Sequence, residues 1–307
     1  MKRVLSVFLS ILIIIAVTTI PVIAAETSTP AINSGSIVLD ADSKLTFSKQ
    51  MDLKYTADLK SGKIKRGTID EIQNLMMQST FATGQEAESI NEILASYGIY
   101  KYEPPTSLKS KLLDDDLIGI MSQNGDVNVI KPSVYYEAWE QTWTITFGGN
   151  WKNNNWTYDR IGVGNIGNVD GYGVGFTNVT KPYTSYVVRQ YAYITDQDNN
   201  YTVSTTNRSD GDGSLGFGFR LQDYIYQGLI EGKYVGYKWY GSCTYNSSFG
   251  SYSGLATSYY IHTWSNAVIN SIGFNASTTG AGLVLGITNA HNSFPAYSTD
   301  TPFGVYP

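Results

Sequence analysis

Cysteine, histidine and charged residues are all scarce in this chain of 307 residues. The single cysteine, Cys243, cannot form an intramolecular disulfide, and it rules out a zinc site built from several thiolates. The two histidines are His262 and His291, so a catalytic triad or an imidazole metal site would have to use one of them. His262 stands between Tyr260 and Trp264 in an alternating segment, which favours a packed ring over a catalytic base.

The first 25 residues have the pattern of a secretory signal peptide. Lys2 and Arg3 precede an apolar stretch over residues 4–17, and Ala24 or Ala25 supplies a small residue for cleavage. We therefore expect a secreted, extracellular protein. No later stretch reaches the ~18 uninterrupted apolar residues of a membrane-spanning helix, so we expect no transmembrane domain after cleavage.

The expected mature chain is acidic. Removal of residues 1–25 leaves 19 basic and 26 acidic residues, which is a net charge of −7. Binding to phosphate backbones requires clustered cations, so we expect no nucleic-acid partner.

The remaining sequence divides into two regions of different composition, 26–130 and 131–307. All six tryptophans and 20 of the 24 tyrosines lie in the second region. In the first region, Thr68 and Thr83 each begin a capping-box pattern followed by apolar residues at helical spacing, and Gly98 supplies a stop signal. We expect a small α-containing N-terminal region and a linker up to residue 130.

From Tyr135 the side chains alternate with a period of two, which is typical of β-strands. The first such segment, 135–147, places Glu137, Trp139 and Trp143 on one face. Eight similar segments separated by turn residues follow at 171–178, 184–194, 201–206, 215–221, 234–245, 256–264, 267–277 and 283–289. This spacing predicts a mainly β protein in which 131–307 forms an antiparallel β-sandwich or jelly-roll-like domain.

Aromatic residues next to amide side chains favour a binding function for this sandwich. Flat rings pack against the C–H faces of sugars, and neighbouring polar groups hydrogen-bond the hydroxyls. We expect a row of uncovered rings to bind a neutral glycan, the cell wall or another surface partner without catalysis. The candidate ligand-binding residues are Trp139, Trp143, Trp151, Trp156, Tyr237 and Trp239.

Glycoside hydrolysis is one alternative, because it needs only two suitably spaced carboxylates. Glu137 shares its predicted strand face with Trp139 and Trp143, whose rings would raise its pKa if they lined a cleft. Glu231 precedes the next aromatic segment and is its candidate partner.

A calcium site is a further candidate, with calcium as the one cofactor considered. Asp196 and Asp198 begin a spacing that suits oxygen ligands, but the following residues depart from a calcium-binding EF-hand loop. Asp210 and Asp212 lie in a second turn that could approach the first. The same residues are also simply good turn formers, so both interpretations stay open.

The second alternative is a membrane-active, pore-forming or antibacterial toxin. Alternating segments rich in serine and threonine, such as 184–194 and 267–277, could insert as hairpins after assembly. The helical N-terminal region would then act as a shielding pro-region.

Overall fold

The computed structural model describes residues 46–104, 125–161, 164–179, 186–227, 232–275 and 282–304. These residues belong to one compact unit that extends from Ala41 to Pro307. The expected signal peptide and Glu231 lie outside the described residues. The fold is mainly β, as the alternating segments predict, and all strand pairs are antiparallel.

Among the described residues, three α-helices precede the sheets: α1 (Phe47–Lys60), α2 (Ile69–Phe81) and α3 (Gly84–Ser96). The predictions for α2 and α3 are confirmed. Thr68 Oγ1 accepts a hydrogen bond from the Glu71 amide at 3.2 Å, which caps α2, whereas the Thr83 side chain makes no such bond. Gly98 has φ of +76°, the left-handed conformation expected just after a helix. Within the described residues, no helix is both long and apolar enough to cross a membrane.

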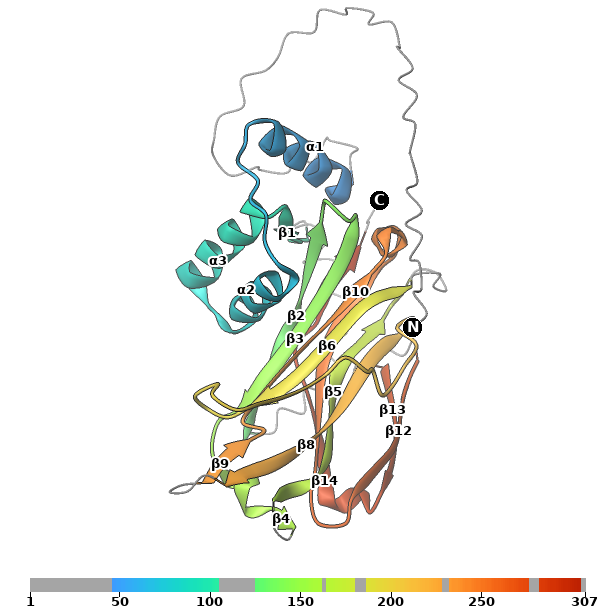
Figure 1. Cartoon of the computed structure of the whole chain (residues 1–307). Coiled ribbons are helices and arrows are strands. Elements are labelled where there is room, and N and C mark those ends of the chain that lie inside the picture. Colours follow the sequence, from blue (N-terminus) through green and yellow to red (C-terminus); the bar gives the residue numbers. More distant parts are fainter. Residues whose placement is uncertain are drawn as a thin grey trace, which may run out of the picture. The chain divides into compact units, whose positions relative to one another are not determined.

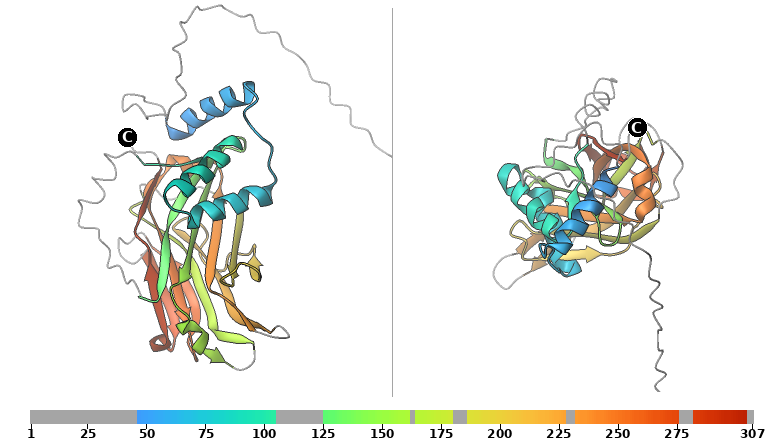
Figure 2. Two further views of the ribbon diagram at one scale, coloured as in Figure 1. Left: turned by 90° about the vertical axis from the view of Figure 1, so that its left-hand side faces the viewer. Right: turned by 90° about the horizontal axis from the view of Figure 1, so that it is seen from above.

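The first sheet has six strands in the order β1-β2-β3-β10-β6-β7 (Figure 1). Its members are β1 (Ile99–Lys101), β2 (Val127–Glu137), β3 (Thr142–Trp151), β10 (Lys238–Tyr245), β6 (Val187–Thr195) and β7 (Thr202–Thr205). We call it the helix-side sheet, because α2 packs on β2 and β3 and α3 packs on β1. Figure 2 shows the three helices gathered beside this sheet.

The second sheet runs in the order β14-β11-β5-β8-β9, and a separate two-stranded hairpin lies beside it. The strands are β14 (Ser293–Tyr297), β11 (Ser253–Thr263), β5 (Asn165–Thr177), β8 (Gly216–Gln227) and β9 (Gly232–Val235), with β15 (Thr301–Gly304) paired to β11 and β4 (Arg160–Ile161) paired to β5. The hairpin consists of β12 (Val268–Phe274) and β13 (Leu283–Thr288).

Two segments expected to be single strands are interrupted. Residues 135–147 form the hairpin of β2 and β3, with a turn at 138–141 in which Gln141 has φ of +55°. Residues 234–245 are divided at Gly236, with φ of +136°, so that β9 joins the second sheet and β10 the helix-side sheet. Both breaks change which side chains share a face.

Aromatic side chains fill the space between the two sheets. Trp239 from β10 stacks on Tyr260 from β11 with ring centroids 4.1 Å apart, and Tyr172 from β5 stacks on the same tyrosine at 5.9 Å. Trp143 packs near Tyr136 in the same core, and both are buried. Much of the aromatic content of region 131–307 therefore forms the interior of the sandwich.

Candidate functional site

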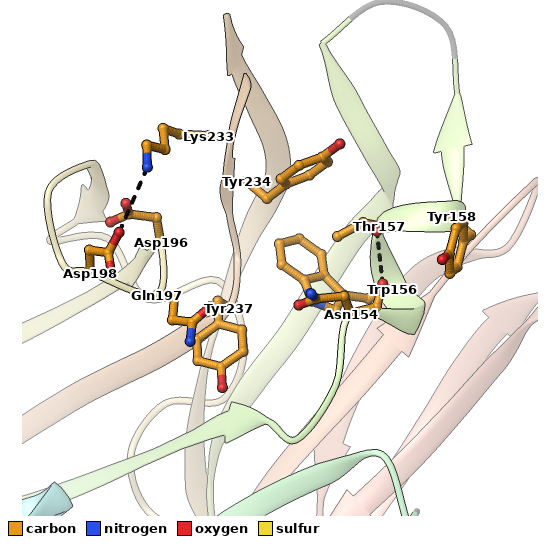
Figure 3. A pocket seen from close by; sticks show the side chains of 10 residues that line it. All are labelled: Asn154, Trp156, Thr157, Tyr158, Asp196, Gln197, Asp198, Lys233, Tyr234 and Tyr237. Atoms are coloured by element: carbon orange, nitrogen blue, oxygen red, sulfur yellow. Dashed lines mark hydrogen bonds and ion pairs between the residues drawn. The ribbon is translucent and has the colours of Figure 1, made fainter. Parts of the chain in front are cut away.

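A pocket of about 700 Å³ opens where three segments distant in sequence meet. The segments are the loop before and through η1 (Asn155–Tyr158), the turn between β6 and β7, and the chain around β9. Figure 3 shows η1 on one side, the acidic turn with Lys233 on the other, and two tyrosines between them. The lining residues are Asn154, Trp156, Thr157, Tyr158, Asp196, Gln197, Asp198, Lys233, Tyr234 and Tyr237.

The η1 side of the pocket is held by local polar contacts. Asn153 Nδ2 donates to Asp126 Oδ1 at 2.7 Å, and the Asn155 amide donates to Asn153 Oδ1 at 2.9 Å. Thr157 Oγ1 donates to the Asn154 carbonyl at 2.8 Å. These bonds fix the loop that carries the aromatic residues of the wall.

Trp156 forms the base of the aromatic wall. Its ring stacks on Trp151 at 6.1 Å and meets Tyr234 nearly edge-on at 6.3 Å, with an angle of 81° between the planes. Tyr234 and Tyr237 are half-buried, whereas Tyr158 is 83% exposed. The pocket thus offers aromatic surfaces that range from buried to open.

The turn between β6 and β7 supplies the polar wall. Asp196 Oδ1 accepts hydrogen bonds from the amides of Asn200 at 2.7 Å and Tyr201 at 3.0 Å, which holds the turn in place. Asp198 lies at the surface, where its carboxylate is 3.7 Å from Lys233 Nζ. The wall therefore combines one buried and one exposed carboxylate.

A buried charged cluster anchors the far end of η1. His262 Nε2 lies 3.0 Å from Asp159 Oδ2, one residue after Tyr158, and His262 Nδ1 lies 2.9 Å from Asp170 Oδ2. Burial by itself lowers the pKa of His262, but Asp170 and the hydrogen bond with Asp159 act against it and raise that pKa to about 10. Burial and the neighbouring Asp170 raise the pKa of Asp223 well above its usual range.

This cluster agrees with the packing role predicted for His262. The imidazole is stacked between Tyr260 and Trp264, with ring centroids 6.2 Å and 5.6 Å away. Both ring nitrogens face carboxylates, so the ring is held as a cation and links β11 to β5 and to η1.

The expected row of uncovered rings is mostly absent from the surface. Trp143, Trp151 and Trp239 are at most 3% exposed and belong to the core of the sandwich. Trp139 is 42% exposed but lies on the β2–β3 turn, outside the pocket. Of the six candidate ligand-binding residues, Trp156 and Tyr237 line the pocket. The other four indoles lie outside the pocket. They could not be told apart from the sequence, because alternation alone does not show which face of a sheet is covered.

Glu137 does not occupy the position that the hydrolase alternative needs. In the β2–β3 hairpin it is paired with Thr142, and Trp143 is paired with Tyr136, so Glu137 and Trp143 point to opposite faces. Its carboxylate contacts Arg189 at 2.5 Å and Thr144, beside a gap of only about 20 Å³. The expectation that Glu137 shares a face with Trp143 is wrong, and its proposed partner Glu231 lies outside the described residues.

The four candidate calcium ligands are divided between two different settings. Asp196 and Asp198 line the pocket, whereas Asp210 forms an ion pair with Arg220 and Asp212 accepts a hydrogen bond from the Ser214 amide. Among the described residues, no group of three or more His, Cys, Asp or Glu side chains could hold a metal ion. Calcium binding by Asp196 and Asp198 stays a prediction.

Several lining residues were not singled out by sequence reasoning. Tyr158 and Gln197 follow the candidate residues Trp156 and Asp196 closely but carry no signal of their own, and Lys233 belongs to no motif. Their meeting depends on the crossing of β9 and β10 between the sheets. The sequence matches no protein-family model, and comparisons with curated proteins and with solved structures found no match either.

Proposed function

We propose that this protein is exported and that its β-sandwich binds a neutral sugar residue of an extracellular glycan in the η1 pocket, without catalysis. The observation that carries the proposal is the pocket itself. Its volume of about 700 Å³ lies in the range of small-molecule sites, and its walls combine aromatic surfaces with a few polar groups.

The aromatic and polar groups are arranged for complementary roles. Tyr234, Tyr237 and Tyr158 offer ring surface for the C–H faces of a sugar, while Asn154 and Gln197 offer amide groups for its hydroxyls. The Asn154 and Gln197 side chains are exposed at the rim, where they can reach a glycan chain that continues outside the pocket.

Retention on insoluble glycans tests the proposal. The mature protein is incubated with cellulose, chitin and purified cell walls, with calcium and with chelator, and the bound fraction is measured. We expect retention on at least one material, and Tyr158→Ala and Tyr237→Ala should each weaken it about 3- to 10-fold because ring contact is lost.

The matched control is Tyr186→Ala. Tyr186 is 71% exposed at the start of β6, while the pocket lies beyond the other end of that strand. Its replacement should leave retention unchanged. Absence of retention on every material would remove the proposal.

A pore-forming toxin is the second candidate function, and one observation favours it. The β12–β13 hairpin is a separate two-stranded sheet that places Ile269 and Ile272 against Tyr259 and Ile261, while Val268 is 49% exposed. An alternating hairpin attached by one apolar face resembles a segment that could detach and insert. Release of dye from lipid vesicles by the mature protein would support this function.

A further inference from the structure

The two oxygens of the Asp196 carboxylate are in different environments. Asp196 is buried, with only 3% of the residue exposed. Oδ1 accepts the two amide hydrogen bonds that hold the turn, but Oδ2 is buried and has no hydrogen-bond partner among the described residues. Asp196 nevertheless lines the pocket, so a small shift of the turn is enough to bring Oδ2 into contact with a bound molecule.

An unpartnered carboxylate oxygen in a buried position is unfavourable unless something supplies a donor. Loss of hydration without a compensating hydrogen bond costs more for charged groups than for neutral ones. The opposite wall lacks an acceptor instead of a donor. Trp156 Nε1 is a buried donor without a hydrogen-bond partner in the described part of the chain. A ligand with several hydroxyls can both donate and accept.

The charges around the turn favour a neutral ligand over a cationic one. Among the described residues, Asp196 and Asp198 are the carboxylates that line the pocket. Lys233 lies 3.7 Å from Asp198, and Lys238 Nζ donates to the Gln197 carbonyl at 3.2 Å on the same turn. Two lysines therefore offset two carboxylates, and an anionic sugar would still meet the carboxylate at the buried end.

We propose that Asp196 determines the specificity of the pocket by accepting, through Oδ2, a hydrogen bond from a hydroxyl group of a neutral sugar residue, and that it disfavours sugars bearing a carboxylate. This inference rests on the proposed glycan-binding function. The inference goes beyond that function by naming Asp196 Oδ2 as the atom whose polar contact selects the ligand.

Affinity electrophoresis with Asp196→Asn tests the inference. Native gels contain a soluble β-glucan, mannan or galactan, or polygalacturonate as the acidic counterpart. Asparagine keeps an oxygen for the Asn200 and Tyr201 amides but replaces the second oxygen with a donor. We expect the mature protein to be retarded by at least one neutral polysaccharide and not by polygalacturonate, and the variant to bind the neutral one about 10- to 100-fold more weakly.

Asp212→Asn is the matched control, because Asp212 also accepts an amide hydrogen bond in a turn but does not line the pocket. It should leave retardation unchanged, and thermal unfolding should show that both variants are folded. If no neutral polysaccharide retards the wild type, this inference fails, and the proposed function fails with it when the insoluble glycans and cell walls also retain no protein. If the wild type is retarded and Asp196→Asn equally so, only this inference fails. Loss of retardation in chelator would indicate that a metal ion, and not a direct hydrogen bond, joins Asp196 to the sugar, and it would overturn this inference as well.

Discussion

His262 Nε2 and Asp159 Oδ2 lie 3.0 Å apart, although 103 residues separate them in sequence. Asp159 follows η1 directly, so this contact ties the aromatic wall of the pocket to the interior of the second sheet. The other ring nitrogen is 2.9 Å from the fully buried Asp170. The imidazolium therefore positions the wall of the candidate site without lining the pocket itself.

Replacement of His262 should destabilise the protein strongly. His262→Gln leaves Asp170 without its cationic partner in the core, and loss of one member of a buried ion pair costs about 3–5 kcal/mol. Urea denaturation followed by tryptophan fluorescence measures the change. The control is His291→Gln, since His291 is exposed and its replacement should shift stability by less than about 0.5 kcal/mol. Equal stability of the two variants would contradict a role for the cluster.

The same cluster predicts a decline in stability with rising pH. His262 has its pKa raised from 6.5 to about 10 in the folded state, so its contribution is complete below pH 6.5 and is lost as the pH rises toward 10. Asp223 also has a raised pKa and acts in the same direction. Tyr172 and Tyr260 face the cluster as well, but burial raises their pKa values and keeps them neutral in this range.

Unfolding temperatures between pH 6 and pH 10 test this dependence. The wild type should become steadily less stable over that interval, and His262→Gln should show a flatter profile. A wild-type protein whose stability is constant or increases from pH 6.5 to 10 would show that the imidazole is not held as a cation.

Replacement of a buried tryptophan should lower the stability of the fold and not ligand binding directly. Trp239 stacks on Tyr260 in the core, so Trp239→Ala should cost about 3–5 kcal/mol of stability. Trp139→Ala removes a ring that is 42% exposed, and we expect a loss below about 1 kcal/mol. Denaturation curves of the two variants make the comparison, and a small effect at Trp239 would contradict the core assignment.

Local signals in the sequence predicted the elements well where the determining contacts are also local. Thr68 caps α2 through a bond three residues away, and the turn residues around Asp196 correctly separate β6 from β7. The β2–β3 turn was missed because Trp139 and Gln141 are not turn formers, and the left-handed Gln141 is imposed by pairing of the flanking strands.

The pocket was beyond prediction because its walls meet only through tertiary structure. Trp156 and Tyr237 were recognised as aromatic residues in polar surroundings, but nothing local separates them from Trp151, which is buried behind Trp156. Alternation assigns side chains to two faces of a strand, and in a sandwich covered by helices both faces can be interior. Asp196 and η1 likewise line the same pocket only because the chain crosses from one sheet to the other between β9 and β10.

Glu137→Gln separates a structural carboxylate from a catalytic one. Glu137 is 2% exposed and contacts both Arg189 and Thr144, so neutralisation should weaken the ion pair and cost about 1–3 kcal/mol. The Arg189 side chain also contacts Glu140 at 2.5 Å, so the charge of Arg189 would still be partly neutralised in this variant. Glycan retention should stay at the wild-type level, because Glu137 does not line the η1 pocket.

The control for this variant is Glu140→Gln, which removes the more exposed partner of the same arginine and should cost less than about 1 kcal/mol. Reducing-sugar release by the wild type that disappears in Glu137→Gln but persists in Glu140→Gln would establish the hydrolase instead. Loss of stability without any change in retention would assign Glu137 a structural role beside α2, and it would leave ligand binding at the Asp196 end of β6.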